Sequence, residues 1–126
     1  MTDIIPVVPY EDIRAAHDWL VKVLGFTSAG VIEDGSGTVI HGEVQLGDRR
    51  IWLHATAAGL STPNQSKAET GGVVVLVPDV DAHYEQAKAA GGEIISEPTD
   101  QDYGQREYGV RDPEGHRWWM ATPFAT

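Results

Sequence analysis

The residues best suited to chemistry lie on two strand-like runs in the first half of the chain. His41 and Glu43 alternate with apolar residues over positions 38–46, and His54 closes the alternating run that follows. Successive side chains of a strand point to opposite faces, so His41 and Glu43 should share one face. An imidazole beside a carboxylate can act as a general base. Acid–base catalysis is therefore one chemistry that this face could support.

Two tryptophans, Trp52 and Trp119, form the second group of candidates. Trp52 shares a strand phase with His54, and Trp119 lies in the last strand-like run of the chain. Indole has a large flat face that suits stacking on a planar ligand and also attracts cations. The alternative is that both rings only fill space. Trp19 and Trp118 lie on the phases opposite to the predicted cup face. We therefore expect both in the core that faces the helices.

Three further candidates, Tyr103, Arg106 and Tyr108, lie at the start of the seventh predicted strand. Together with the residues above they predict an apolar pocket with a few polar groups, which is typical of a small-molecule site. No nucleophile is evident, because the chain has no cysteine and its serines lie in loops or at a strand end. His83 is expected on a helix surface, and His116 is expected to be structural.

Composition excludes several classes of function. The chain has 126 residues, enough for one compact domain, and a formal net charge of −10 with no basic run. Such a chain repels phosphate backbones, so nucleic acid is not expected as a partner, whereas a cationic ligand would be attracted. The other interpretation is that the charge serves solubility alone. Without cysteine, a signal-peptide pattern or a long apolar run, we expect a cytoplasmic protein that does not enter a membrane.

Hydrophobic periodicity predicts the elements that position these residues. A helical pattern begins after Asp12 and stops at Gly25, and a second begins after Asp79 and stops at Gly91. The helix starts lie 67 residues apart and the stops 66 apart, which indicates an internal repeat. The predicted strands cover residues 4–8, 26–32, 38–46 and 50–55 in the first half, and 72–77, 93–96, 106–112 and 116–121 in the second.

The resulting order, β-α-β-β-β twice, predicts an α+β fold. We expect a single domain over residues 1–126, with βαβββ modules at about 1–56 and 72–126 and a linker loop at 57–71. One helix would cover one face of each module's sheet. The remaining faces would form a cup-shaped mixed sheet with the helices on the outside.

Three stretches resemble the vicinal oxygen chelate superfamily, which includes glyoxalases, bleomycin-resistance proteins and dioxygenases. They are residues 12–26, residues 77–83, and the segment from Tyr103 through the Asp112-Pro113-Glu114-Gly115 turn to His116. In metal-dependent members, four cup-facing positions bind one divalent cation. The resemblance puts these positions at Ile5, Trp52, Gly72 and Trp119, none of which has a ligand atom in its side chain. It therefore implies no metal and no cofactor.

The resemblance is closest to metal-free members that bind antibiotics, and it implies a homodimer. It favours a binding protein over an enzyme, with antibiotic sequestration by tryptophan stacking on a bulky aromatic ligand that could be cationic. The alternative is a glyoxalase-like lyase or dioxygenase-related enzyme with a displaced metal site, for which His54 is the nearest donor. A structural or regulatory protein is a third alternative. Neither the ligand nor the strand register follows from the sequence.

Overall fold

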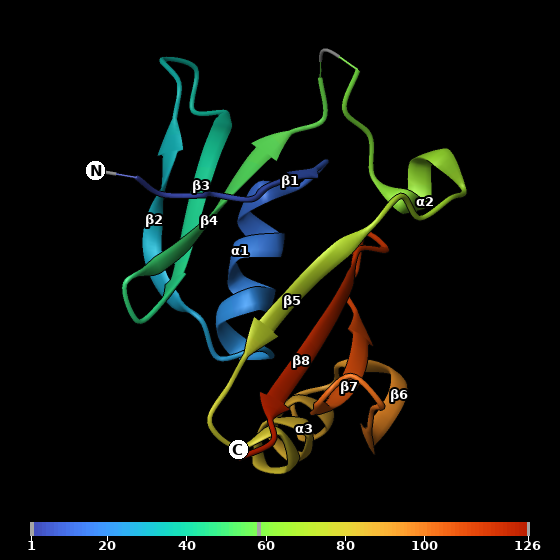
Figure 1. Ribbon diagram of the computed structural model, residues 1–126. Helices are drawn as coiled ribbons and strands as arrows, with labels where there is room; N and C mark the ends of the chain where they lie inside the picture. Colours follow the sequence, from blue (N-terminus) through green and yellow to red (C-terminus); the bar gives the residue numbers. More distant parts are fainter. Residues whose placement is uncertain (1, 58, 126) are drawn as a thin grey trace.

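The computed structural model describes residues 2–57 and 59–125, and it contains two separate four-stranded sheets with one longer helix each (Figure 1). The first module comprises β1 (Val7–Tyr10), α1 (Ile13–Lys22), β2 (Thr27–Glu33), β3 (Val39–Leu46) and β4 (Arg49–Ala55). The second comprises β5 (Gly72–Leu76), α3 (Val80–Ala89), β6 (Glu93–Asp100), β7 (Gln105–Arg111) and β8 (Arg117–Pro123), and α2 (Pro63–Ser66) lies between the modules. The predicted α+β fold with tandem βαβββ modules is confirmed.

The two modules repeat the same topology and register. Their strand orders are β1-β4-β3-β2 and β5-β8-β7-β6, with the first strand of each module parallel to its last. Val7 lies beside Trp52 in the first sheet, and Val74 lies beside Trp119 in the second. Equivalent aspartates cap the two helices, because Asp12 accepts a hydrogen bond from the Ala15 amide and Asp79 accepts one from the Ala82 amide.

Both sheets turn their helix-facing sides toward one hydrophobic core. The buried face of α1 packs on the first sheet, and the buried face of α3 packs on the second. The buried residues of both modules, including Leu53, Trp118 and Met120, form a single hydrophobic cluster. The opposite sides, here called the outer faces, therefore point away from this core. Within the described residues, no strand of one sheet pairs by hydrogen bonds with a strand of the other. None of the helices described has the length and hydropathy to cross a membrane.

Two local differences from the predicted elements have clear causes. β1 covers residues 7–10 rather than 4–8, because its parallel partners on β4 are Trp52 to Ala55. Pro9 is tolerated there because β1 is an edge strand. The predicted linker also contains α2, which has Pro63 at its start and a reciprocal capping box between Thr62 and Gln65.

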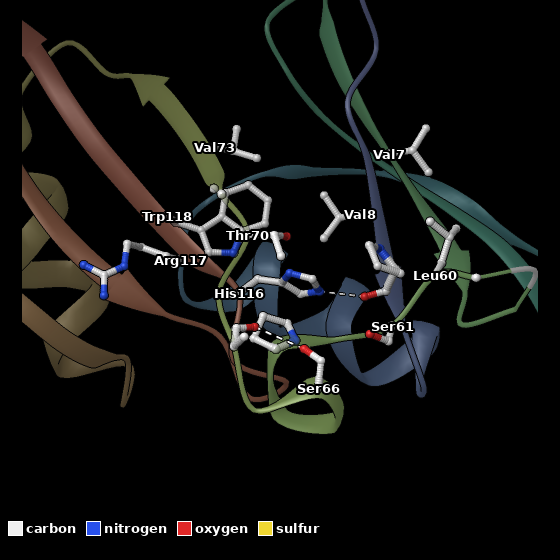
Figure 2. A pocket seen from close by; sticks show the side chains of 16 residues that line it. Val7, Val8, Leu60, Ser61, Ser66, Thr70, Val73, His116, Arg117 and Trp118 are labelled. Atoms are coloured by element: carbon white, nitrogen blue, oxygen red, sulfur yellow. Dashed lines mark hydrogen bonds between the residues drawn. The ribbon is translucent and has the colours of Figure 1, made fainter.

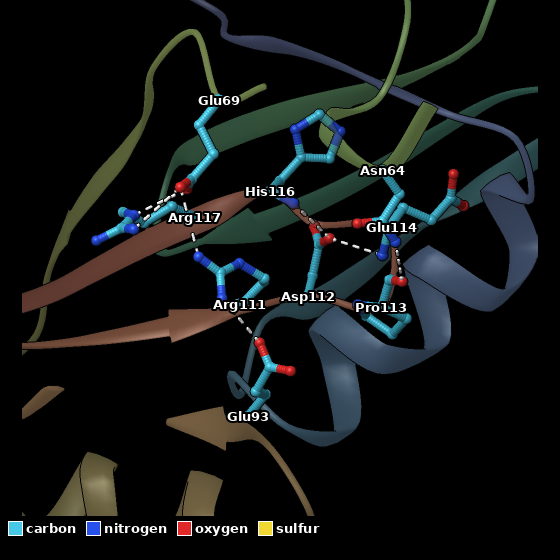
Figure 3. Close-up of polar contacts among 9 residues, drawn as sticks. All are labelled: Asn64, Glu69, Glu93, Arg111, Asp112, Pro113, Glu114, His116 and Arg117. Carbon is cyan, nitrogen blue, oxygen red and sulfur yellow. Dashed lines mark hydrogen bonds and ion pairs between the residues drawn. The ribbon is translucent and has the colours of Figure 1, made fainter. Parts of the chain in front are cut away.

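The turn after β7 connects the modules (Figure 3). Asp112 is buried, and its Oδ2 accepts hydrogen bonds from the Tyr10 hydroxyl at 2.6 Å and the Trp118 indole at 3.1 Å. Its Oδ1 accepts the amides of Glu114 and His116, each at 3.0 Å. Burial, followed by the charge of Asp112, raises the pKa of Tyr10. The Asp112 carboxylate thus joins β1 to the second module.

Two neighbours in this turn extend the connection. The Glu114 carboxylate accepts the amides of Glu11 and Asp12 at 2.6 and 3.0 Å, immediately before α1. The His116 Nε2 lies 2.7 Å from the Pro9 carbonyl and therefore donates to it. His116 thus has a structural contact, as expected.

His83 was expected on the helix surface, and the structure corrects this. It is half-buried, with Nε2 2.8 Å from the Leu24 carbonyl and Nδ1 2.6 Å from the Tyr108 hydroxyl. A carbonyl only accepts, so Nε2 donates to Leu24 and Nδ1 accepts from Tyr108. Burial lowers the pKa of His83, and the Leu24 hydrogen bond opposes this in part. His83 therefore links α3 to the chain just after α1.

Candidate functional site

The outer face of the first sheet brings together four of the predicted site residues. His41 lies directly opposite His54, and Glu43 lies opposite Trp52. The His41 Nε2 is 3.1 Å from the Glu43 Oε1. The His41 ring meets the rings of both Trp52 and His54 edge-on, with centroids 5.3 Å apart in each case. This arrangement provides an aromatic surface beside an imidazole–carboxylate pair.

The Trp52 indole is only partly exposed. Its Nε1 is enclosed and has no hydrogen-bond partner among the described residues. A buried N–H without an acceptor is costly, so Trp52 keeps its position through packing against His41 and the neighbouring strands. The exposed part of this residue is therefore ring surface rather than its N–H group.

Trp119 occupies the equivalent position on the outer face of the second sheet. It lies between Gly109 of β7 and Val74 of β5. Its ring extends over Gly72, where a Cβ atom would come within 2.7 Å of the Trp119 Cζ3. The Arg117 guanidinium lies 5.7 Å from the centroid of the ring and is held by an ion pair with Glu69 at 2.9 Å. Gly72 thus gives the indole room to lie against the sheet.

Glu107 belongs to the same outer face and was missed by the sequence analysis. It lies opposite Ala121 and is only 8% exposed. Its Oε1 accepts hydrogen bonds from the Tyr103 hydroxyl and, at 3.4 Å, from the Gln105 amide. The hydrogen bond to Glu107 raises the pKa of Tyr103. Alternate residues of a strand share one face, so Arg111, Gly109 and Glu107 should lie on the same side of β7. This alternation could have identified Glu107 from the sequence.

Tyr108 and Arg106 were expected to line the site, and the structure corrects both. Tyr108 is completely buried beneath α3, its ring 5.3 Å from that of Tyr84, and burial raises its pKa. Arg106 forms ion pairs with Asp81 of α3 and Asp100 of β6, both at 3.1 Å. Both residues occupy the strand phase that faces α3, whereas Glu107 and Gly109 occupy the other. Tyr103 is 68% exposed and lies at the edge of the outer face.

Two grooves lie along the edge strand β5. The first is also lined by β1, and the second by Ile4 and Pro6, which precede β1. One, of about 440 Å³, is lined by residues including Val8, Thr70, His116 and Trp118 (Figure 2). The other, of about 640 Å³, is mostly apolar, and its lining includes Ile4, Phe26, Ile51, Val74 and Leu76. Neither groove is lined by Trp52 or Trp119, so within one chain both tryptophans lie on open faces beside the grooves.

The donor set does not fit a metal centre of the kind that the family resemblance suggests. Ile5, Trp52, Gly72 and Trp119 have no oxygen, sulfur or imidazole donor in their side chains. Among residues 2–57 and 59–125, no group of three or more histidine and acidic side chains is placed to hold a metal ion. The side chains at these four positions therefore do not supply the ligands of such a metal centre.

Comparisons with known proteins agree with this fold. The family model of the Glyoxalase/Bleomycin resistance protein/Dioxygenase superfamily matches residues 5–120. The crystal structure of TioX from Micromonospora sp. ML1 is 30% identical with a TM-score of 0.78, covering 98% of this chain and 100% of that one. The bleomycin-binding protein of Streptomyces verticillus, solved with copper(II)-bleomycin, is 24% identical with a TM-score of 0.72, covering 99% and 98%. An uncharacterized protein of Mycobacterium tuberculosis is 28% identical over 123 residues, covering 94% of this chain and 72% of its own length.

Proposed function

Because this chain belongs to the glyoxalase/bleomycin resistance protein/dioxygenase superfamily, we propose that it is a small-molecule binding protein that sequesters an antibiotic-like aromatic compound. The observation that carries the proposal is the placement of Trp52 and Trp119 at equivalent positions on the two outer faces. By the family resemblance, two of the four metal positions would hold indole rings here. Removal of a free compound needs only tight binding and no reaction.

The ligand class follows from the residues around the two tryptophans. Each indole offers a planar apolar surface to an aromatic ring, and aromatic pairing contributes about 0.5–1.5 kcal/mol beyond the burial of area. His41, Glu43 and His54 surround Trp52 with polar groups that can orient a bound molecule. An apolar surface with a few fixed polar groups is the usual composition of a small-molecule site.

A second copy of the chain is the proposed means of enclosing the ligand. Val7, Val74 and Leu76 lie on edge strands, and about half of each side chain is exposed, at 46%, 55% and 56%. Such apolar edges are commonly covered by another chain. A twofold dimer through these edges would place the first outer face of one protomer near the second outer face of its partner. Trp52 of one protomer and Trp119 of the other would then border one site.

The bleomycin-binding structures give the proposal a precedent at the level of fold. The protein from Streptomyces verticillus shares this fold at 24% identity and was solved with bound copper(II)-bleomycin. The ligand class proposed for the present chain therefore depends on its own tryptophans and polar residues.

An enzymatic function is the second candidate, and the His41–Glu43 pair favours it. The 3.1 Å contact leaves the other imidazole nitrogen available as a proton acceptor, and His54 lies directly opposite. A glyoxalase-like lyase or dioxygenase-related enzyme would need a metal site displaced toward these residues. Metal analysis of the purified protein separates the candidates, because stoichiometric zinc, nickel, iron or manganese would support the enzyme and contradict metal-free binding.

The binding proposal is tested by tryptophan fluorescence and calorimetry with bleomycin and a panel of polycyclic aromatic antibiotics. We expect at least one compound to bind at micromolar concentrations or tighter. Trp52→Leu and Trp119→Leu should each weaken that binding about tenfold or more, which corresponds to roughly 1.4 kcal/mol. Phe124→Leu is the matched control, because it removes an exposed ring outside both outer faces. Absence of binding across the panel would contradict the proposal.

A further inference from the structure

Glu107 differs from the other buried polar residues of the protein. Thr62 uses its side chain in the cap of α2, and Asp112 accepts four hydrogen bonds through both of its oxygens. In Glu107, Oε1 accepts both hydrogen bonds that the side chain receives from the described residues, and Oε2 accepts none. Oε2 is not sealed, since the one enclosed side-chain polar atom without a partner is the Trp52 Nε1. One oxygen of a largely buried carboxylate therefore has no hydrogen-bond partner among the described residues and is not fully enclosed.

No cation of the described chain compensates this carboxylate. Among residues 2–57 and 59–125, no lysine, arginine or histidine nitrogen lies within 4.0 Å of it. The arginines of the second module are all held by other carboxylates: Arg106 by Asp81 and Asp100, Arg111 by Glu69 and Glu93, and Arg117 by Glu69.

The position gives this carboxylate few hydrogen-bond donors. Burial removes a carboxylate from water, and a tyrosine hydroxyl and an amide are neutral donors that replace only part of its hydration. A largely buried carboxylate with an unused acceptor calls for an explanation, and ligand recognition is one. A cation is the kind of partner that would complement this oxygen.

Comparison of the two modules supports the same conclusion. On the first outer face, the Glu43 carboxylate contacts the His41 imidazole, and His54 lies across from His41. On the second, Glu107 occupies the register position of His41, and Ala121 occupies that of His54. Glu43 on the first outer face thus has an imidazole partner, whereas Glu107 on the second outer face has no basic partner among the described residues.

We propose that Glu107 and Tyr103 form a recognition site for the protonated nitrogen of a cationic aromatic ligand. The ligand N–H would donate to the free Oε2, and the exposed Tyr103 ring would border the charge. Trp119 lies diagonally across the same face, where it could contact the aromatic part of the ligand. The net charge of −10 would attract such a ligand from solution. This inference rests on the proposed binding function and narrows its ligand to cations.

Two probes of the same ring system test the inference. At neutral pH, 9-aminoacridine is a cation and acridine is neutral, and fluorescence titration measures the affinity of each. We expect the wild type to bind 9-aminoacridine about tenfold more tightly or better, as a charge-assisted hydrogen bond would provide. Glu107→Gln should reduce this preference to about twofold or less without changing the acridine affinity. Glu97→Gln removes the same charge from an exposed site of β6 and should keep the preference.

A stability measurement separates recognition from a structural role. Glu107→Gln keeps an acceptor for Tyr103 and removes the uncompensated charge, so its urea midpoint should equal or exceed that of the wild type. A clear fall in the midpoint would assign Glu107 a structural role and overturn the inference. Tyr103→Leu provides a second variant at an exposed position, and it should lower the cation preference while the protein stays folded.

The outcomes also separate this inference from the proposed function. Equal affinities of the wild type for the two probes would overturn cation recognition and leave aromatic binding intact. Failure of both probes and of the antibiotic panel to bind would overturn both. Retention of the full preference in Glu107→Gln would overturn the assignment of the site to Glu107.

Discussion

At the scale of single residues, Asp112 and Glu107 show two uses of a buried carboxylate. Asp112 receives a donor from β1, another from β8 and two from its own turn, so each oxygen is satisfied. Glu107 receives neutral donors on one oxygen only. A fully satisfied buried group stabilises the fold, whereas a partly satisfied one suggests a function.

Asp112→Asn is expected to destabilise the protein by roughly 2–4 kcal/mol. The amide would place an N–H group against donors from Tyr10 and Trp118 or from the turn, leaving buried groups unpaired. Urea unfolding measures the change. The exposed Asp102→Asn is the control and should shift the free energy of unfolding by less than about 0.5 kcal/mol. Similar midpoints for the two variants would contradict the structural role of Asp112.

At the scale of elements, His83 connects α3 to β7 and to the chain beyond α1. The imidazole is neutral in this arrangement, because Nδ1 accepts from Tyr108 while Nε2 donates to Leu24. Protonation would turn the accepting nitrogen into a second donor. Burial lowers the pKa of His83 below its ordinary value of 6.5.

The free energy of unfolding should therefore fall as the pH drops below about 6.5. Below that pH the unfolded chain takes up a proton at residue 83 that the folded chain does not yet bind, which favours unfolding. The stability contributed by neutral His83 is fully present above the pKa of this residue in the unfolded chain. It is lost as the pH falls toward the lower pKa of His83 in the folded protein. Urea unfolding at several pH values should show a shallower decline for His83→Gln than for the wild type. Parallel curves would show that His83 does not contribute.

At the scale of the whole molecule, the helix-facing sides of both sheets share one core, so both outer faces point away from that core. The grooves beside β1 and β5 expose apolar side chains, among them Ile4 and Leu76. A single chain therefore provides two half-sites with exposed edges. The proposed dimer would cover these edges and complete the site.

Leu76→Glu is expected to convert a dimer into monomers and to weaken ligand binding at the same time. A charge in an apolar interface must be desolvated without a partner, which disfavours association. Ile32→Glu is a matched control, because Ile32 is 55% exposed on the edge strand β2 and Leu76 is 56% exposed on β5. Sedimentation velocity measures the mass. A monomeric wild type, or loss of the dimer in both variants, would contradict the proposed interface.

The sequence alone was sufficient for the order of elements, the internal repeat and the grouping of His41 with Glu43. These features depend on local periodicity and on the capping residues Asp12 and Asp79, which act within a few residues of the chain. The equivalence of Trp52 and Trp119 could also be predicted, because the internal repeat assigns each position of one module a counterpart in the other.

Only the tertiary structure decided which phase of β7 faces α3. Alternation establishes that Glu107 and Tyr108 lie on opposite faces, but contact with α3 determines which of them is buried in the core. The same holds for His83, whose partners are at Leu24 and Tyr108, and for Asp112, whose partner Tyr10 is 102 residues away. Such contacts depend on how the two modules pack together, and local sequence patterns do not encode that packing.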